Sequence, residues 1–450
     1  MARDGRYPFI AYRGEIGHGD HAWPIRFQIA HGVDGELRFR VKPIAYTAET
    51  VELSRIWHRP GQGAEYFRLK GVSAGGVTFK SAHMTIYSMG TVTTSAGTTI
   101  APRLQCAKGS FRSEPEGETG RLFVRYLLRG FEAFPSVETT CRLGRVSMAG
   151  TYPTPRTEKL SGHLQVVPDG ALETVAEWRT EAEALCLHLQ RYMSFAQSRL
   201  IRAPVQQVWD GKTYEEVVFR QSRRRRASQA VIHPMMLQAY FECAVAAFFD
   251  PPVAVSNATF PLEWFAMDAS YTETRLMNAM TALENLTQSN LAPEQTAYLA
   301  DARFEKIARA MRAAARAYVA DHPVSPETDP ASAQAETAMI AGLAGKMRDL
   351  NRRPLNEKIL MLADQWQVPL DDLLVGDALA RAIRARNTIV HRGWYYEPAD
   401  GTPEQRDLWD HVLLMREVVI RFILTTLAYQ GRYISFRGGQ HDVEFPPSRD

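Results

Sequence analysis

The sequence RARNTIVHRG, residues Arg384 to Gly393, stands near the C-terminal end of the chain. Around it, Leu379, Ile383 and Val390 fall at offsets of four and seven residues, which predicts one apolar stripe along an amphipathic helix. Arg386 lies in the middle of that stripe. A guanidinium is rarely buried without an anionic partner, because leaving it unpaired costs several kcal/mol. We therefore expect Arg386 to meet a carboxylate or a phosphate.

The same helix places a histidine near this arginine. Asn387 and His391 are four residues apart, so they should share one flank of the helix, and Gly393 is suited to end it. An arginine that holds a phosphate and a histidine that moves a proton are the two groups that transesterification of an RNA backbone requires. The spacing also fits a simpler interpretation, in which Arg386 pairs with a structural carboxylate and His391 is only solvated.

The run Arg386-Asn387-Thr388-Ile389-Val390-His391 resembles the signature of the HEPN ribonuclease superfamily, which is an arginine, a polar residue, three more residues and a histidine. The run falls on the penultimate helix of a C-terminal helical block, and a region rich in expected strands precedes that block. This order resembles the ApeA-like branch, bacterial anti-phage proteins that join an ApeA-type N-terminal domain to a HEPN domain.

The resemblance implies a metal-independent endoribonuclease that needs no cofactor. His391 would act as general base on the ribose 2′-hydroxyl, Arg386 would stabilise charge on the phosphate, and Asn387 would position either group. HEPN domains also often carry an acidic residue on an early helix that faces the site. Glu284 is the best match and Glu273 the second, and the carboxylate would pair with Arg386 or orient His391.

The resemblance also implies partners. HEPN domains pair so that their two motifs face one cleft, so we expect a homodimer through the C-terminal helical block with an isologous interface. RNA is the expected substrate, with tRNA as one candidate. The N-terminal region would sense a trigger such as a phage component, and the activated nuclease would serve abortive infection.

Further basic and aromatic residues are candidates for binding RNA. A cluster between two expected helices could hold flanking phosphates, or could simply be a basic turn, and the residues after the motif could stack on an unpaired base or pack in the core. The candidates are Arg348, Arg352 and Arg353 in the cluster, which also contains Asn351, and Arg392 and Tyr395 beside the histidine. The run Arg223–Arg226 is either a second docking site for RNA or a solvated loop.

Composition limits the class of protein. The 450 residues leave room for two or three domains, and a formal charge of +3 is too small to indicate nucleic-acid binding by itself, so an RNA site must be a local patch. Four cysteines lie far apart without a CxxC pair, which indicates neither a zinc site nor a disulfide framework. The N-terminus lacks the apolar segment of a signal peptide, and no apolar run approaches a membrane span of about 18 residues. We expect a cytoplasmic protein without membrane partners.

The expected fold class is α+β. Residues 1–252 form an ApeA-type domain, β-rich over 6–165 as a sandwich or a curved mixed sheet, and mixed α/β over 166–252. Residues 253–432 form a HEPN helical domain, and 433–450 a tail. Short runs of β-branched and aromatic residues, separated by glycine and polar turns, predict strands at 25–29, 37–41, 66–69, 77–79, 84–87, 122–127, 137–141, 205–208 and 214–219. Helical spacing predicts helices at 172–197, 272–288, 296–320, 338–350, 354–367 and 402–430, with a loop over 322–337.

Two other function classes remain open from the sequence. The helical block could be a non-catalytic module that binds RNA or protein and dimerises, with the N-terminal region as a recognition domain. A metal-dependent hydrolase could use His18 and His21 of the run His18-Gly19-Asp20-His21, although two histidines and an aspartate of one loop need a further ligand, and the sequence does not single one out.

Overall fold

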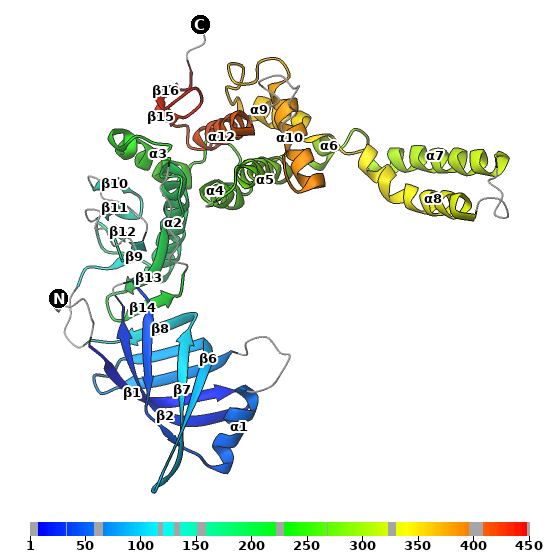
Figure 1. Cartoon of the computed structure of the whole chain (residues 1–450). Helices are drawn as coiled ribbons and strands as arrows, with labels where there is room; N and C mark the ends of the chain where they lie inside the picture. Colours follow the sequence, from blue (N-terminus) through cyan, green and yellow to red (C-terminus); the bar gives the residue numbers. More distant parts are fainter. Residues whose placement is uncertain are drawn as a thin grey trace. The chain divides into compact units, whose positions relative to one another are not determined.

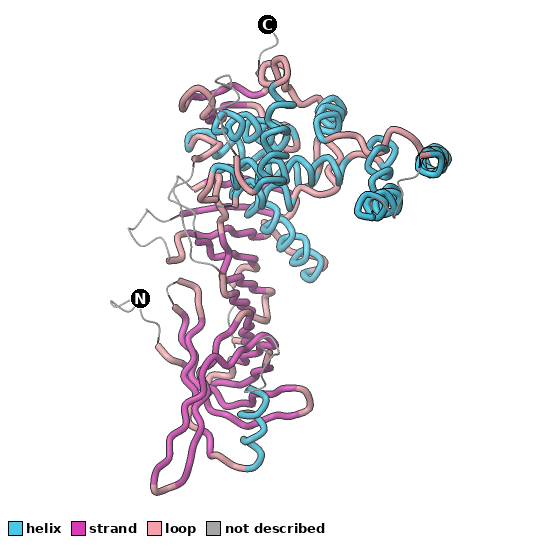
Figure 2. The backbone as a smooth tube through the Cα atoms, turned by 45° about the vertical axis from the view of Figure 1, so that its right-hand side comes forward, coloured by secondary structure: helices cyan, strands magenta, loops and turns pink. Residues whose placement is uncertain are grey.

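The computed structural model describes residues 8–32, 34–57, 66–115, 120–129, 136–150, 159–221, 229–267, 269–322, 330–395 and 408–447. The chain divides into two compact units, Met1–Asp250 with Gly431–Tyr433, and Pro251–Gln430 with Ile434–Asp450. Strands dominate the first unit and helices the second (Figure 2), which confirms the α+β class. The division falls at the Pro251-Pro252 pair.

The described strands of the first unit form one 14-stranded sheet in the order β10-β11-β12-β9-β13-β14-β8-β6-β5-β1-β2-β3, with β7 pairing β6 and β4 (Figure 1). Every register that the described residues define is antiparallel, so the sheet is antiparallel rather than mixed, and β3 also contacts β7, from which it is separated in the strand order. The strands are β1 (Ile10–His18), β2 (His21–His31), β3 (Leu37–Val41), β4 (Ile44–Ala45), β5 (Phe67–Ser73), β6 (Thr78–Thr94), β7 (Gly97–Cys106), β8 (Lys108–Ser113), β9 (Phe123–Arg129), β10 (Val137–Cys141), β11 (Gly144–Gly150), β12 (Gly162–Val167), β13 (Arg202–Trp209) and β14 (Tyr214–Phe219).

Side chains of alternating strand positions build the core of this sheet. In β5 every second residue from Phe67 to Ser73 is buried, as period-two spacing requires when one face is covered. Aromatic rings fill the centre of the covered face, where Phe79 lies 4.9 Å from Phe111 between ring centroids and Tyr12 stacks on Phe27 at 5.5 Å. Burial of these large rings is the main apolar stabilisation of the sheet.

Several strand predictions need correction. The segments expected at 77–79 and 84–87 belong to one long strand, β6, whose pairing with β5 shifts register between Ser81 and Met84 and therefore interrupts the alternation. Helix α1 (Ala48–Trp57) was not expected inside the β-rich region. Strands β13 and β14 pair with β9 and β8, so the part expected as a separate mixed segment contributes to the same sheet.

The first unit also carries helices against the sheet. Helix α2 (Val175–Ala196) packs on β9 and β12, and its Trp178 donates a hydrogen bond to the Leu143 carbonyl at 2.9 Å. A short 3-10 turn, η1 (Pro234–Met236), leads into α3 (Leu237–Phe249), which packs on α2 and β10.

The second unit is built around α5, which packs against α4, α9, α10 and α12. Helices α7 and α8 lie against each other (Figures 1 and 2). The elements are α4 (Thr259–Ala266), α5 (Thr272–Asn290), α6 (Pro293–Thr296), α7 (Asp301–Asp321), α8 (Pro330–Leu350), α9 (Leu355–Trp366), α10 (Ala378–Arg392) and α12 (Leu408–Thr425). The tail that follows contains β15 (Gly431–Ser435) and β16 (His441–Phe445), which pair in a two-stranded sheet.

Two helix predictions in this unit were wrong at their starts. The helix expected from residue 296 begins only at Asp301, because the buried Asn351 holds the preceding chain extended. Its side chain accepts from the Leu299 amide at 2.9 Å and donates to the Leu299 carbonyl at 2.8 Å. Helix α8 begins at Pro330, inside the range expected as a loop, because a proline fits the first turn of a helix as well as a loop.

No helix within the described ranges is long and apolar enough to cross a bilayer.

Candidate functional site

Helix α10 carries the arginine and the histidine, and its buried face explains why the helix forms there. Leu379, Ala382, Ala385 and Ile389 are buried at helical spacing, against α5, α9 and α12. Val390, expected on this stripe, is instead 50% exposed. The buried stripe runs through the small residues Ala382 and Ala385, which let neighbouring helices approach closely, rather than through the larger Ile383 and Val390.

Arg386 is held at the edge of this packed face by a carboxylate from α5. Its Nη2 donates to Glu284 Oε1 at 2.6 Å, and its Nη1 donates to Asn387 Oδ1 at 3.2 Å. The side chains of Arg386 and Glu284 are 23% and 37% exposed, so water reaches both. The Arg386 Nε atom is buried and has no hydrogen-bond partner among the described residues. The anionic partner expected for Arg386 is therefore Glu284, and one of its donors stays unsatisfied.

Glu273, the second acidic candidate, is placed differently. It lies in the first turn of α5, more than two turns before Glu284, and makes no ion pair with another described residue. Since negative charge is favourable at a helix N-terminus, its position is explained by the helix dipole alone.

His391 lies in the last turn of α10 and is exposed. On a regular helix it stands about 140° around the axis from Arg386, whereas Asn387 stands about 100° from Arg386 and about 40° from His391. The hydrogen bond to Asn387 therefore turns the guanidinium toward the flank that His391 occupies. The His391 ring makes no hydrogen bond to another described residue, so both nitrogens are open to a ligand.

The two ends of α10 are fixed by local contacts. Gly393 follows the helix with φ +82°, and its amide donates to the Ile389 carbonyl at 2.7 Å, which confirms its capping role. Asp377 occupies the N-cap position without capping the helix, because its carboxylate instead pairs with Arg381 and, at 3.1 Å, with Arg384. Hydrogen bonding to Arg384 is the first cause that lowers the pKa of Asp377, and both arginine charges reinforce it.

The basic cluster expected between helices is largely engaged in contacts of its own. Arg352 pairs with Asp349 at 3.3 Å, and Arg353 pairs with Glu357 at 3.1 Å while lying 4.7 Å from the Tyr298 ring centroid. Their described contacts do not include a residue of α10. The side chain of Arg348 lies outside the described residues. Asn351 fixes the chain before α7 and is not free to contact a phosphate.

The residues beside His391 are more accessible. Arg392 is the last residue of α10 and is exposed, Trp394 is 52% exposed, and Tyr395 is partly buried. Exposed basic and aromatic side chains next to an exposed imidazole are compatible with binding a nucleotide, as the sequence suggested. The run Arg223–Arg226 and the helix start expected at residue 402 lie outside the described residues.

The histidines of the first unit pack against aromatic rings. His18 and His21 face each other across the β1–β2 turn, with His18 against Phe67 at 5.3 Å and His21 stacked on Trp23 at 5.8 Å between ring centroids. Of the residues that the structure describes, no three or more histidine, cysteine or acidic side chains gather in a way that could hold a metal ion.

One buried ion pair was missed by the sequence analysis. Arg421 of α12 is 1% exposed and donates to both carboxylate oxygens of Asp372, with a further hydrogen bond of 2.8 Å to the Pro369 carbonyl. It lies inside an otherwise apolar run, VVIRFIL, which is a signal for a buried charge that needs a partner. These contacts tie α12 to the segment before α10.

No family model, no curated protein and no solved structure matches this chain.

Proposed function

We propose that the chain is a metal-independent endoribonuclease of the HEPN type that acts in anti-phage defence. The observation that supports this most is the pairing of Glu284 with Arg386, because it joins the arginine of the motif to an acidic residue of an early helix. The same acidic residue was selected from the sequence as the best match to the HEPN pattern.

The chemistry needs a base, a cation and no metal. His391 takes the proton of the ribose 2′-hydroxyl, the 2′-oxygen attacks the adjacent phosphorus, and Arg386 stabilises the charge that develops on the phosphate oxygens. The bond to the 5′-oxygen breaks, and a protonated imidazole returns a proton to this leaving oxygen. The products are a 2′,3′-cyclic phosphate and a 5′-hydroxyl. Asn387 keeps the guanidinium on the flank of His391.

A second copy of the chain completes this proposal. One chain supplies one arginine and one histidine, and the proposed reaction uses one imidazole as base and one as acid. A homodimer through the helical unit would bring two copies of α10 to one cleft, with exposed Val390 and Trp394 beside each site as apolar contact area. The first unit would recognise the trigger that releases activity.

Cleavage of RNA by the purified full chain tests the proposal. Wild type should cut RNA in the presence of a chelator and leave cyclic phosphate ends, and His391→Ala and Arg386→Ala should each lose at least about 100-fold in rate, the range expected of a general base or a charge-stabilising group. The matched controls are His441→Ala and Arg384→Ala, which remove an exposed histidine elsewhere and an exposed arginine of α10. Equal cleavage in all five proteins would exclude this site as the source of activity.

The second candidate is a non-catalytic module that binds RNA or protein and dimerises. It is favoured by one observation, that Glu284 already neutralises Arg386 in the isolated chain, as in a structural ion pair. This candidate predicts RNA binding or dimerisation that survives His391→Ala and no cyclic phosphate ends with any variant.

A further inference from the structure

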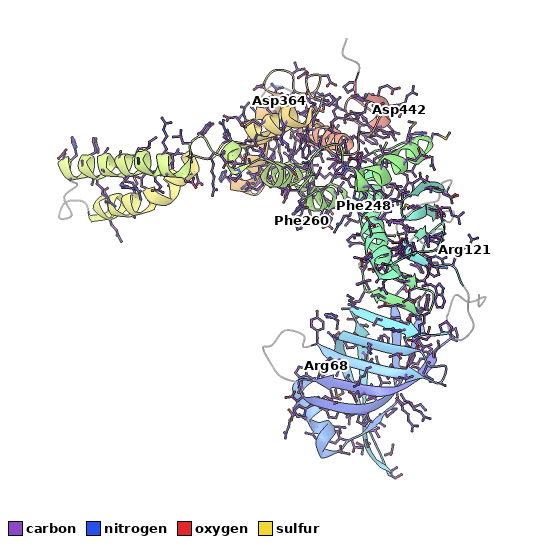
Figure 3. The ribbon with its side chains drawn as sticks, turned by 180° about the vertical axis from the view of Figure 1, so that it is seen from behind. Arg68, Arg121, Phe248, Phe260, Asp364 and Asp442 are labelled. Atoms are coloured by element: carbon purple, nitrogen blue, oxygen red, sulfur yellow. The ribbon has the colours of Figure 1, made fainter. Side chains whose placement is uncertain are left out.

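The sheet of the first unit contains a concavity that the proposed nuclease site does not use. Its volume is about 610 Å³, and it is lined by residues of strands β1, β2, β5, β6, β8 and β14. Arg68, labelled in Figure 3, marks its position on β5. Phe79 and Phe111 belong to the core on the opposite face, so Lys80 and Ser110, their neighbours along β6 and β8, point into the concavity.

The strand registers place a row of side chains across this concavity. Glu15 pairs with Lys70, Lys70 with Lys80, and Lys80 with Ser110, and residues directly opposite in antiparallel strands share one face. Lys70 and Lys80 are therefore like charges directly opposite each other, which is an unfavourable arrangement unless an anion lies between or above them. Glu15 compensates Lys70, with 2.8 Å between the Lys70 Nζ and Glu15 Oε1 atoms. Lys80 makes no ion pair with a described residue.

The charges of the lining are not balanced. The two acidic side chains of the lining already form ion pairs. Glu15 pairs with Lys70, and Glu215 pairs with Arg179, with 2.7 Å between Arg179 Nη2 and Glu215 Oε2. Arg68 donates to the neutral carbonyl of Gly19, and Lys108 lies over the Phe219 ring at 5.3 Å. Arg68, Lys80 and Lys108 thus bring three positive charges to the concavity without a carboxylate of their own, and His83 also lines it.

We propose that this concavity binds a small phosphate-bearing ligand of about nucleotide size, with Lys80 and Lys108 contacting its phosphates. Lysine ammonium groups are common partners of phosphate, and the volume falls within the range of about 300–1,000 Å³ that small-molecule sites occupy. The carboxylates of Glu15 and Glu215 within the lining disfavour a long polyanion that would have to pass over them. This site is independent of Arg386 and His391, and would give the first unit a ligand to recognise.

Calorimetric titration of the full chain tests this proposal with three probes, pyrophosphate, ATP and adenosine. Pyrophosphate and ATP should bind saturably and more weakly as salt is added, whereas adenosine, which lacks phosphates, should not bind. Lys80→Ala should weaken ATP binding about tenfold, the loss expected for one charge-assisted contact. Lys42→Ala removes an exposed lysine outside the concavity and should leave the affinity unchanged.

Two further variants keep the outcome decisive. Lys108→Ala should weaken ATP binding as Lys80→Ala does, and serves in its place if the latter loses its far-ultraviolet circular dichroism. His391→Ala should bind ATP as wild type does, so failure of the nuclease proposal and failure of this one are distinguishable. Absence of saturable ATP and pyrophosphate binding, or an equal loss in Lys42→Ala, would overturn the site. A single-stranded RNA that binds more tightly than ATP with the same Lys80 dependence would overturn the small-ligand assignment.

Discussion

Breaking the ion pair between Glu284 and Arg386 should cost unequal amounts from its two sides. Glu284→Ala removes a charge-assisted hydrogen bond of 2.6 Å and leaves a guanidinium whose Nε is already buried without a partner. Bonds to charged groups contribute about 1.5–3 kcal/mol, and since Arg386 is 23% exposed, water recovers part of this. We expect Glu284→Ala to lower the free energy of unfolding by about 2 kcal/mol.

Arg386→Ala should be milder. It leaves a carboxylate that is 37% exposed and can be solvated, and alanine is a better helix former than arginine, so we expect a loss of about 1 kcal/mol. Once Glu284 is gone, removal of Arg386 should cost little more. The double variant should therefore lose about 2 kcal/mol, which gives a coupling energy of about 1 kcal/mol.

Thermal unfolding followed by far-ultraviolet circular dichroism measures these differences, because the helical unit gives most of that signal. For a unit of this size 1 kcal/mol corresponds to about 2–4 °C, so Glu284→Ala should lower the Tm by about 6 °C. Gln288→Ala, an exposed change on the same helix, is the control and should shift the Tm by less than about 2 °C. Purely additive effects of the two single variants would refute the coupling, and with it the idea that Glu284 orients Arg386.

Three further predictions concern stability, each measured by urea unfolding of the named variants. Burial lowers the pKa of His188 to about 4, although a hydrogen bond between the ring and the Ala244 carbonyl acts in the opposite direction. As the pH drops from about 6.5 to about 4, the unfolded chain takes up a proton before the folded chain does, so the free energy of unfolding should fall. His188→Gln should flatten that decline. Burial acts to raise the pKa of Asp372, but Arg421 overcomes it and the pKa is lowered, so this carboxylate stabilises the fold above its unfolded pKa and the contribution is lost as pH falls through the folded value. Asp372→Ala should cost about 3 kcal/mol and more than Arg421→Met, because it takes this carboxylate away from an arginine that is 1% exposed. Gly144→Ala should cost more than about 2 kcal/mol, since a Cβ there would lie 2.2 Å from the Val167 carbonyl oxygen. Gly97 also has a positive φ, but a Cβ there would meet open space, so Gly97→Ala should cost only the backbone strain of about 1 kcal/mol.

The motif helix could be predicted from the sequence because the decisive signals are local. The apolar spacing, the glycine at its end and the need of Arg386 for an anion all lie within or next to Ala378–Arg392. The identity of the anion, Glu284, lies 102 residues away in sequence and was found only through a family resemblance. Helical spacing alone does not distinguish Glu284 from the other glutamates as the partner of Arg386.

The failures have a common physical cause, which is that distant residues decide local structure. The chain before Asp301 looks helical, yet Asn351 holds it extended through two hydrogen bonds from about 50 residues away. Likewise a register shift against β5, between Ser81 and Met84 of β6, interrupts the alternation that would have joined two short expected strands. Secondary-structure propensity could not predict either effect, since it depends on a short stretch of sequence and the partner residue lies outside that stretch.

The net charge of the chain did not predict the cationic concavity on the sheet. A formal charge of +3 over 450 residues suggests no affinity for phosphates, and the lysines of β5, β6 and β8 are separated in sequence by long runs of mostly neutral residues. Antiparallel pairing brings Lys70 opposite Lys80 and places Lys108 on the strand beside β6, while the lining acids Glu15 and Glu215 pair with Lys70 and Arg179. Charge that is diluted along the chain is thereby concentrated on one face of the sheet, so the register rather than the composition determines where an anion can bind.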